Sequence, residues 1–185
     1  MSKIQPARKT ARKSGSTMQH TRRWVLWLFP LLFLLIAIGI IFSIMPNRKS
    51  TATGPRFQKQ GELTFISAAG QSLQTIDIEI ADTDLARAQG LMWRRTMEEN
   101  QGMLFLMETE EPQSFWMLNT YIPLDILFVS AQREIVTIRD NTQPQSLSAV
   151  TSDAPALYVV EVNAGFCVRH GIQIGDRIEF ARQEK

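Results

Sequence analysis

Two acidic residues interrupt otherwise apolar runs of the sequence. Asp125 lies within Leu124–Val129, and Glu161 lies within residues 157–162. Side chains alternate between the two faces of a strand, so we expect each carboxyl group on a face shared with apolar residues. A charge in such a place must find a partner or change its protonation state. The pair is therefore a candidate for general acid and base in the hydrolysis of a glycoside or an ester.

The alternative is a structural role for the two acids. Arg87 or Arg94 would then pair with each carboxylate and hold a helix and its following loop on the sheet, as buried Arg–carboxylate pairs often do. Ion-pair networks perturb carboxylates as readily as active sites do, which favours the structural interpretation. Direct arginine contacts to both acids, with no cleft, would exclude the hydrolytic interpretation.

Other polar and aromatic residues lie near these runs. Asn119 and Thr120 form a polar corner, where such side chains commonly bond to neighbouring backbone, although loops also carry ligand-binding groups. Asn163 follows the run that contains Glu161, and we include it in the candidate site. Trp93 and Trp116 would suit stacking against a sugar ring, but aromatic residues of a small domain are mostly core.

Sulfur-containing residues suggest weaker candidates. Cys167 is the only cysteine, which excludes an intramolecular disulfide, and an isolated thiol three residues before His170 is more often inert than catalytic. Five methionines would suit copper(I), but packing explains them more simply: Met92, Met97, Met103, Met107 and Met117. No HExxH or CxxC motif is present, so we expect neither a metal site nor a cofactor.

An uncharged apolar segment precedes the region that contains these residues. Residues 24–45 would form a helix long enough to cross the hydrocarbon layer of about 30 Å. Residues 1–23 contain seven basic and no acidic residues, which predicts a cytoplasmic amino end. Cleavage as a signal peptide, or export through the twin-arginine pattern at 21–26, is less favoured because the apolar run is long.

The predicted organisation is a basic cytoplasmic tail (1–23), a transmembrane anchor (24–45), a linker (46–61) and a domain outside the cytoplasm (62–185). In a bacterium with two membranes this domain would be periplasmic. All 18 acidic residues lie beyond position 50, against 11 basic residues there. The domain is therefore acidic, which argues against a nucleic-acid partner.

Short apolar or alternating runs predict a mainly β domain. Strands are expected at 62–67, 72–81, 102–107, 124–129, 134–139, 157–162 and 177–180. One short helix is expected at 84–89, capped by Asp82 or Thr83 and stopped by Gly90, with a helical turn at 166–171. An acidic turn at 108–112 and a loop at 140–153 complete the pattern. The fold class is a small β-sandwich or partly closed barrel.

Several motifs in order carry a family resemblance. They are Gly90-Leu91-Met92, Gly102-Met103-Leu104-Phe105, Phe115-Trp116-Met117, Asn119-Thr120, Ile122-Pro123-Leu124-Asp125 and Glu161-x-Asn163-Ala164-Gly165. Over residues 62–181 the chain resembles the domain-of-unknown-function family 192. The resemblance implies a mainly β domain, often found behind a signal or anchor, and it implies no activity.

We expect a non-enzymatic binding module for a small polar ligand or a cell-envelope partner. The expected pocket is lined by Arg87, Arg94, Trp116, Asn119, Thr120, Asp125, Glu161 and Asn163. One alternative is a cell-envelope glycan hydrolase that uses Asp125 and Glu161. Another is a structural or assembly module with an exposed apolar patch and no pocket.

Overall fold

The computed structural model describes residues 54–183. Among these residues no helix has the length and apolar character needed to cross a membrane. The predicted tail (1–23), anchor (24–45) and first part of the linker lie outside the described residues. The domain from residue 54 onward is therefore considered by itself.

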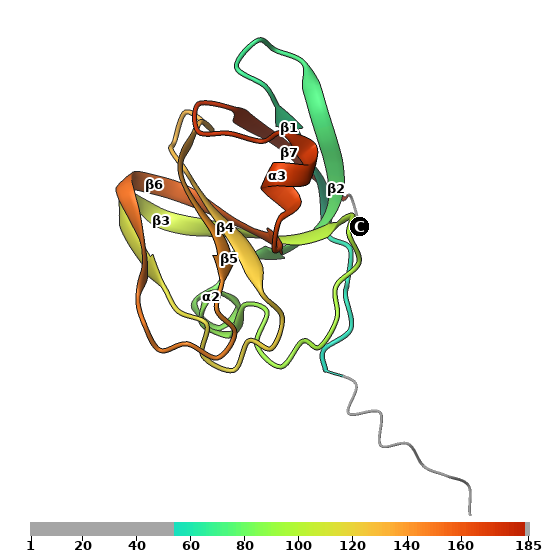
Figure 1. Cartoon of the computed structure of the whole chain (residues 1–185), viewed down its shortest axis with the longest axis vertical. Coiled ribbons are helices and arrows are strands. Elements are labelled where there is room, and N and C mark those ends of the chain that lie inside the picture. The colour runs from blue at the N-terminus through green and yellow to red at the C-terminus, as the bar shows by residue number, and fades with distance from the viewer. Residues whose placement is uncertain (1–53, 184–185) are drawn as a thin grey trace, which may run out of the picture. The chain divides into compact units, whose positions relative to one another are not determined.

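Seven strands and two short helices make up the domain (Figure 1). The strands are β1 (Gly61–Ile66), β2 (Ser72–Ala81), β3 (Gln101–Phe115), β4 (Leu124–Val129), β5 (Ile135–Thr142), β6 (Val150–Asn163) and β7 (Arg177–Arg182). The helices are α2 (Asp84–Gln89) and α3 (Phe166–His170). The prediction of a mainly β domain with one or two short helices is confirmed.

All strands belong to one sheet, in the order β5-β4-β6-β3-β2-β1-β7. Only β2 and β3 are parallel, and α2 lies in the connection between them. The sheet curls until its outer strands meet at one end, where Glu134 bridges to Arg177 and the Ile135 N–H donates to the Asp176 carbonyl over 2.8 Å. Of the two predicted architectures, the structure is the partly closed barrel.

The short helix α2 begins and ends at the residues that the sequence indicates. The Thr83 hydroxyl accepts a hydrogen bond from the Ala86 N–H, which satisfies one of the free donors of the first turn. Gly90 ends the helix with φ of 47°, a conformation that glycine adopts without steric cost. The chain then turns into the loop that leads to β3.

Two hydrophobic clusters lie on opposite faces of the sheet. In β4, Leu127 and Val129 belong to one cluster, whereas Ile126 and Phe128 belong to the other. All six residues of β4 are buried, as expected for a strand covered on both faces. The helix α3 packs on the first cluster through Phe166, and the second cluster includes Leu91 from the loop after α2. Figure 1 shows the two helices at different ends of the domain.

Two predicted loops are shorter than expected. β3 continues through the acidic segment to Phe115, with irregular pairing between Leu106 and Glu111, and β6 already begins at Val150. Strand pairing, such as that of Phe115 with Val150, satisfies backbone hydrogen-bonding groups and does not depend on the polarity of the side chains. The polar composition of these segments therefore led to the wrong prediction of loops. The register between β4 and β5 shifts between Leu124 and Ile126, which places a bulge in β5 between Arg139 and Thr142.

Candidate functional site

A pocket of about 450 Å³ opens beside α2 and the loop that follows it. Its walls come from that helix and loop, from the middle and the end of β3, from the loop that follows β3, from β6 and from the loop that precedes β6. The lining is mainly apolar and includes Leu91, Met92, Phe105, Met107, Phe115 and Trp116. The volume and lining are typical of sites that bind small molecules.

Glu161 contributes the only acidic side chain in the wall of this pocket. It is 5% exposed, its side chain lines the open pocket, and no hydrogen bond found among residues 54–183 reaches its carboxyl group. Burial raises the pKa of Glu161 from its ordinary value of 4.5 to about 8, because a carboxylate loses its hydration there. At neutral pH the group in the free pocket is therefore mostly uncharged.

Gly90 leaves room for the Phe105 ring and lies close to this carboxyl group. A Cβ atom at Gly90 would lie 3.2 Å from the Phe105 ring and 4.0 Å from Oε2 of Glu161. The positive φ of Gly90 would also strain any residue with a side chain. The residue that ends α2 therefore also shapes the pocket.

The mouth of the pocket is partly apolar and carries one cation. Trp116 is 54% exposed and Leu147 is 70% exposed. The Arg87 guanidinium donates to Asp84, to the Leu106 carbonyl over 3.0 Å and to Glu108 over 2.7 Å. These contacts hold Arg87 at the rim, and none of them reaches Glu161.

Asp125 lies outside this pocket. It is fully buried, and its carboxylate accepts three backbone N–H bonds, from Asn141 over 2.9 Å and from Gly165 and Cys167 over 3.0 Å each. Gly165 precedes α3 and has no side chain to cap it, so Asp125 satisfies free donors at the start of that helix. The bulge of β5 places the Asn141 N–H within reach. Asp125 therefore links β4 to the backbone of β5 and to the start of α3.

The expectation that Asp125 and Glu161 share a pocket is wrong. In the register between β4 and β6, Asp125 is opposite Val162 and Ile126 is opposite Glu161. Directly opposed residues of neighbouring strands share a face, so the two carboxyl groups point to opposite faces of the sheet. They cannot act together on one bond.

The predicted pairing of these acids with Arg87 and Arg94 is also wrong. Arg94 is 4% exposed and forms a buried ion pair of 2.5 Å with Glu79. Burial raises the pKa of Glu79, while the Gln58 N–H and Arg94 partly offset this effect. Arg94 therefore supports β2 from the loop after α2 and does not line the pocket.

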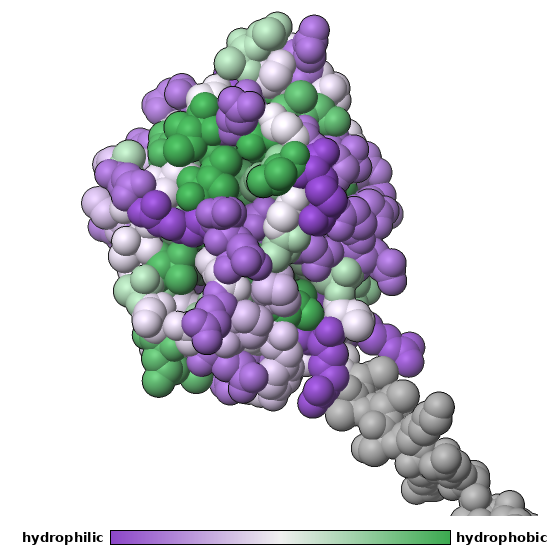
Figure 2. All heavy atoms as spheres, viewed as in Figure 1, coloured by the Kyte–Doolittle hydropathy of each residue, from purple (hydrophilic) through white to green (hydrophobic). Residues whose placement is uncertain are grey.

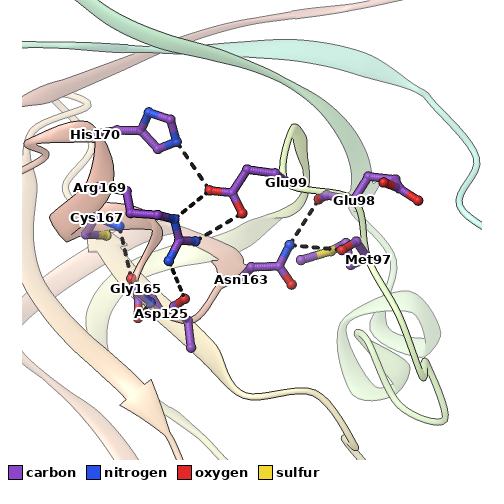
Figure 3. A network of polar contacts seen from close by, with 10 residues as sticks. Met97, Glu98, Glu99, Asp125, Asn163, Gly165, Cys167, Arg169 and His170 are labelled. Carbon is purple, nitrogen blue, oxygen red and sulfur yellow. Dashed lines mark hydrogen bonds and ion pairs between the residues drawn. The ribbon is translucent and has the colours of Figure 1, made fainter.

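A polar network joins the loop before β3 to α3 (Figure 3). Arg169 donates to both carboxylate oxygens of Glu99, over 2.9 and 3.0 Å. Asn163 donates to the carbonyls of Met97 and Glu98, each over 3.0 Å. Asn163 is therefore a backbone clamp in this structure and is not part of the pocket wall.

The polar corner has a largely structural geometry. Asn119 adopts φ of 56°, which asparagine tolerates better than most residues, and its carbonyl accepts from the Trp93 N–H over 2.8 Å. Thr120 is buried and its hydroxyl donates to the Leu118 carbonyl over 3.4 Å, yet Thr120 also lines the pocket. The interpretation of Trp93 and Trp116 as core residues is wrong, since they are 46% and 54% exposed.

The sulfur-containing residues are mostly packed inside the domain. Cys167 is buried, and burial together with the nearby Asp125 carboxylate raises the pKa of its thiol, which makes it a poor nucleophile. His170 contacts Glu99 over 3.3 Å, and no hydrogen bond joins it to Cys167. Met103 and Met117 belong to the second hydrophobic cluster, as the packing interpretation predicts.

Comparison with known proteins assigns the family. Residues 65–180 match the domain-of-unknown-function family 192, DUF192, described as an uncharacterised conserved region. The chain belongs to the DUF192 family. No curated protein matches it. The suspected resemblance is confirmed over nearly the expected residues.

Among the solved structures that share this fold are the following two. The first is from Sinorhizobium meliloti and is described provisionally as a transcription regulator; it is 38% identical, with a TM-score of 0.64, over 68% of this chain and 98% of that one. The second, of unknown function, is from Novosphingobium aromaticivorans; it is 35% identical, with a TM-score of 0.63, over 69% of this chain and 91% of that one. These similarities support the DUF192 fold and leave its chemistry open.

The pocket brings together four of the predicted site residues, namely Arg87, Trp116, Thr120 and Glu161. Arg94, Asn119, Asp125 and Asn163 do not line it. Sequence reasoning missed Gly90 and Phe105 as pocket residues, because both were assigned purely structural tasks. The sequence offered one indication of this pocket. Gly90 ends a helix, and Glu161 interrupts an apolar run without an evident partner.

Proposed function

We propose that the DUF192 domain of this chain is a binding module for a small, largely apolar molecule. The observation that supports this function is the Glu161 carboxyl group, which is buried in the pocket wall without a hydrogen-bond partner in the described part of the chain. Buried polar groups are normally paired, and an unpaired one in a pocket suits a ligand that supplies the partner. The sequence favoured a polar ligand, but the apolar lining favours one with an apolar body.

A binding role fits the site better than hydrolysis by two carboxyl groups. Among the pocket residues only Arg87 and Glu161 carry a titratable side chain, and Arg87 is already engaged by Asp84 and Glu108. Asp125, the second acid that the hydrolase alternative needs, points to the other face of the sheet. One carboxyl group is enough to orient a ligand, whereas glycoside hydrolysis requires two beside the same bond.

A membrane location completes the proposal. The uncharged residues 24–45 and the basic residues 1–23 favour an anchored chain with its pocket outside the cytoplasm. Alkaline phosphatase, which is active only outside the cytoplasm, should be active when fused after residue 185 and inactive when fused after residue 20. The reverse pattern would contradict this topology.

Binding at the pocket is tested by screening fragments against the full chain in detergent with ¹H–¹⁵N NMR spectra. We expect aromatic fragments to shift the amide signals of Gly90, Phe105 and Trp116. Ala149→Trp adds bulk at an exposed lining position and should abolish these shifts, whereas Ala69→Trp, in an exposed turn outside the pocket, should leave them unchanged. Shifts that survive Ala149→Trp would contradict the proposed pocket.

A further inference from the structure

The charges around the pocket narrow the class of its ligand. We propose that the ligand is a small organic ammonium ion with an apolar or aromatic body, whose charged head binds the Glu161 carboxylate. This inference rests on the proposed function, because it names the ligand of the same pocket. Three features support this ligand class: Glu161 has no described partner, negative charge lies beside the pocket, and the lining is aromatic.

Glu161 receives no cation from the described part of the chain. Arg87, the cation of the pocket, donates all its described hydrogen bonds to Asp84, Glu108 and the Leu106 carbonyl. Forming a bare carboxylate at a buried position is costly, and a cation brought by the ligand removes much of that cost. The site therefore has an acidic group in place and lacks its counter-charge.

The groups that surround Glu161 are otherwise neutral or already paired. On the adjacent strands its direct neighbours are Met103 of β3 and Ile126 of β4. Beyond Met103, Glu79 of β2 shares the same face, but it is paired with Arg94. From the side of α2 the approaching residue is Gly90.

The charges on the Arg87 side of the pocket sum to a net negative value. Arg87 lines the pocket, and two exposed carboxylates outside its lining, Asp84 and Glu108, contact it. A net negative rim attracts a cationic ligand and repels an anionic one. Figure 2 shows polar residues over much of the viewed face, with apolar groups gathered in its upper part and at its lower left.

The lining suits an ammonium ion better than a sugar. Phe105 and Phe115 meet edge to face with centroids 5.1 Å apart, and Trp116 lies beside them in the wall. Aromatic faces attract cations and bury apolar groups. A sugar would need partners for many hydroxyl groups, and the pocket offers few polar side chains beyond Thr120, Ser114 and Gln89.

Binding of an ammonium ion would release a proton. The neutral Glu161 acid loses its proton to solvent, and the resulting carboxylate pairs with the ligand cation, so charge and atoms balance. Because the pKa of Glu161 is raised to about 8 by burial, affinity should rise about tenfold per pH unit below that value and then level off. A neutral ligand that accepts a hydrogen bond from the protonated Glu161 acid would instead bind less tightly as the pH rises above about 8.

The test compares three probes of similar shape by isothermal titration calorimetry on the full chain in a neutral detergent. The probes are 2-phenylethylammonium, 2-phenylethanol and 3-phenylpropionate. At pH 8.5 we expect the ammonium ion to bind about tenfold more tightly than the alcohol, as a charge-assisted hydrogen bond would provide. Glu161→Gln should reduce this preference to about twofold or less, while binding of the alcohol persists.

The outcomes separate the two proposals. If the alcohol or the carboxylate binds as tightly as the ammonium ion, the proposed ligand class is wrong, whereas the proposed binding function is still supported. If all three bind equally to the wild type and to Glu161→Gln, Glu161 has no part in recognition. If none binds at millimolar concentration, the pocket itself and the proposed function are contradicted. Proton uptake, instead of release, on binding of the ammonium ion at pH 7 would also overturn the inference.

Discussion

Asp125 and Glu161 lie on neighbouring strands, and their carboxyl groups enter opposite faces of the same sheet. Asp125 accepts three backbone N–H bonds, whereas Glu161 has no hydrogen-bond partner in the described residues. Two acids with similar sequence contexts therefore have different tasks. Asp125 stabilises the junction of β4, β5 and α3, and Glu161 faces the pocket.

Asp125→Asn should destabilise the domain by about 3 kcal/mol or more, because an amide replaces one acceptor oxygen by a donor that faces backbone N–H groups. Urea unfolding of the full chain measures the change. Asp153→Asn is the matched control: its side chain is 66% exposed and pairs with Arg139, so it should cost less than about 1 kcal/mol. Equal effects of the two substitutions would contradict the role of Asp125.

Glu161 should make the domain less stable at alkaline pH. Its pKa is raised from 4.5 to about 8 in the folded state, so between these values the folded state holds a proton that the unfolded state has lost. This contribution to stability is fully present below about pH 4.5 and falls by about 1.4 kcal/mol per pH unit until about pH 8. Glu161→Gln should remove that slope, which urea unfolding from pH 5 to 9 measures.

Glu111 provides the control for this experiment. It is an exposed residue of β3 that pairs with Ala156 of β6 and lies outside the pocket. Glu111→Gln should leave the pH dependence as in the wild type. If Glu161→Gln and the wild type keep a constant difference in unfolding free energy from pH 5 to 9, the carboxyl group is not buried as described.

Substitutions at Arg94 and Glu79 should have strongly non-additive effects on the unfolding free energy, because the two side chains form an ion pair. Arg94→Met leaves a buried carboxylate unpaired and should cost about 3–5 kcal/mol. Adding Glu79→Gln should recover part of this loss, because the unpaired charge is then removed. Arg182→Met, which breaks an exposed pair with Asp82, should cost less than about 1 kcal/mol. Additive effects of the Arg94 and Glu79 substitutions would show that the pair does not form.

Cys167 should be unreactive in the folded domain. Its thiol is buried, and the raised pKa keeps it protonated at pH 8, where an exposed thiol reacts with Ellman's reagent. Cys167 is the only cysteine, so the absorbance reports it alone. We expect no reaction within an hour in native buffer and complete reaction in concentrated guanidinium chloride. Rapid reaction of the native protein would contradict the packing of α3.

Local patterns predicted the elements well and their mutual arrangement poorly. Thr83 and Gly90 mark the ends of α2 in the sequence because capping is a local interaction. Asp125 and Glu161 are 36 residues apart in the sequence, and their relative faces depend on the register between β4 and β6. The backbone partners of Asp125 come from β5 and the start of α3, and no local pattern points to them.

The arginines illustrate the same limit. The structural interpretation of the sequence pairs Arg87 or Arg94 with each of the acids Asp125 and Glu161. In the structure, Arg87 pairs within its own helix and with β3, and Arg94 pairs with Glu79 on β2. Glu79 alternates with Ile78 and Ile80 in the sequence, a pattern typical of a polar strand face, but Glu79 is buried and pairs with Arg94 from the loop after α2. Tertiary covering of a strand face is not visible in the alternation of the strand itself.

The state of Glu161 is measured most directly by ¹³C NMR of the full chain labelled at the glutamate carboxyl carbons, with Glu161→Gln used to assign the signal. The account predicts a titration midpoint near pH 8 for the free protein. It also predicts that saturating 2-phenylethylammonium moves this midpoint downward, because the ligand stabilises the carboxylate. A midpoint near the ordinary 4.5 in the free protein would contradict the buried, unpartnered carboxyl group on which the proposed pocket depends.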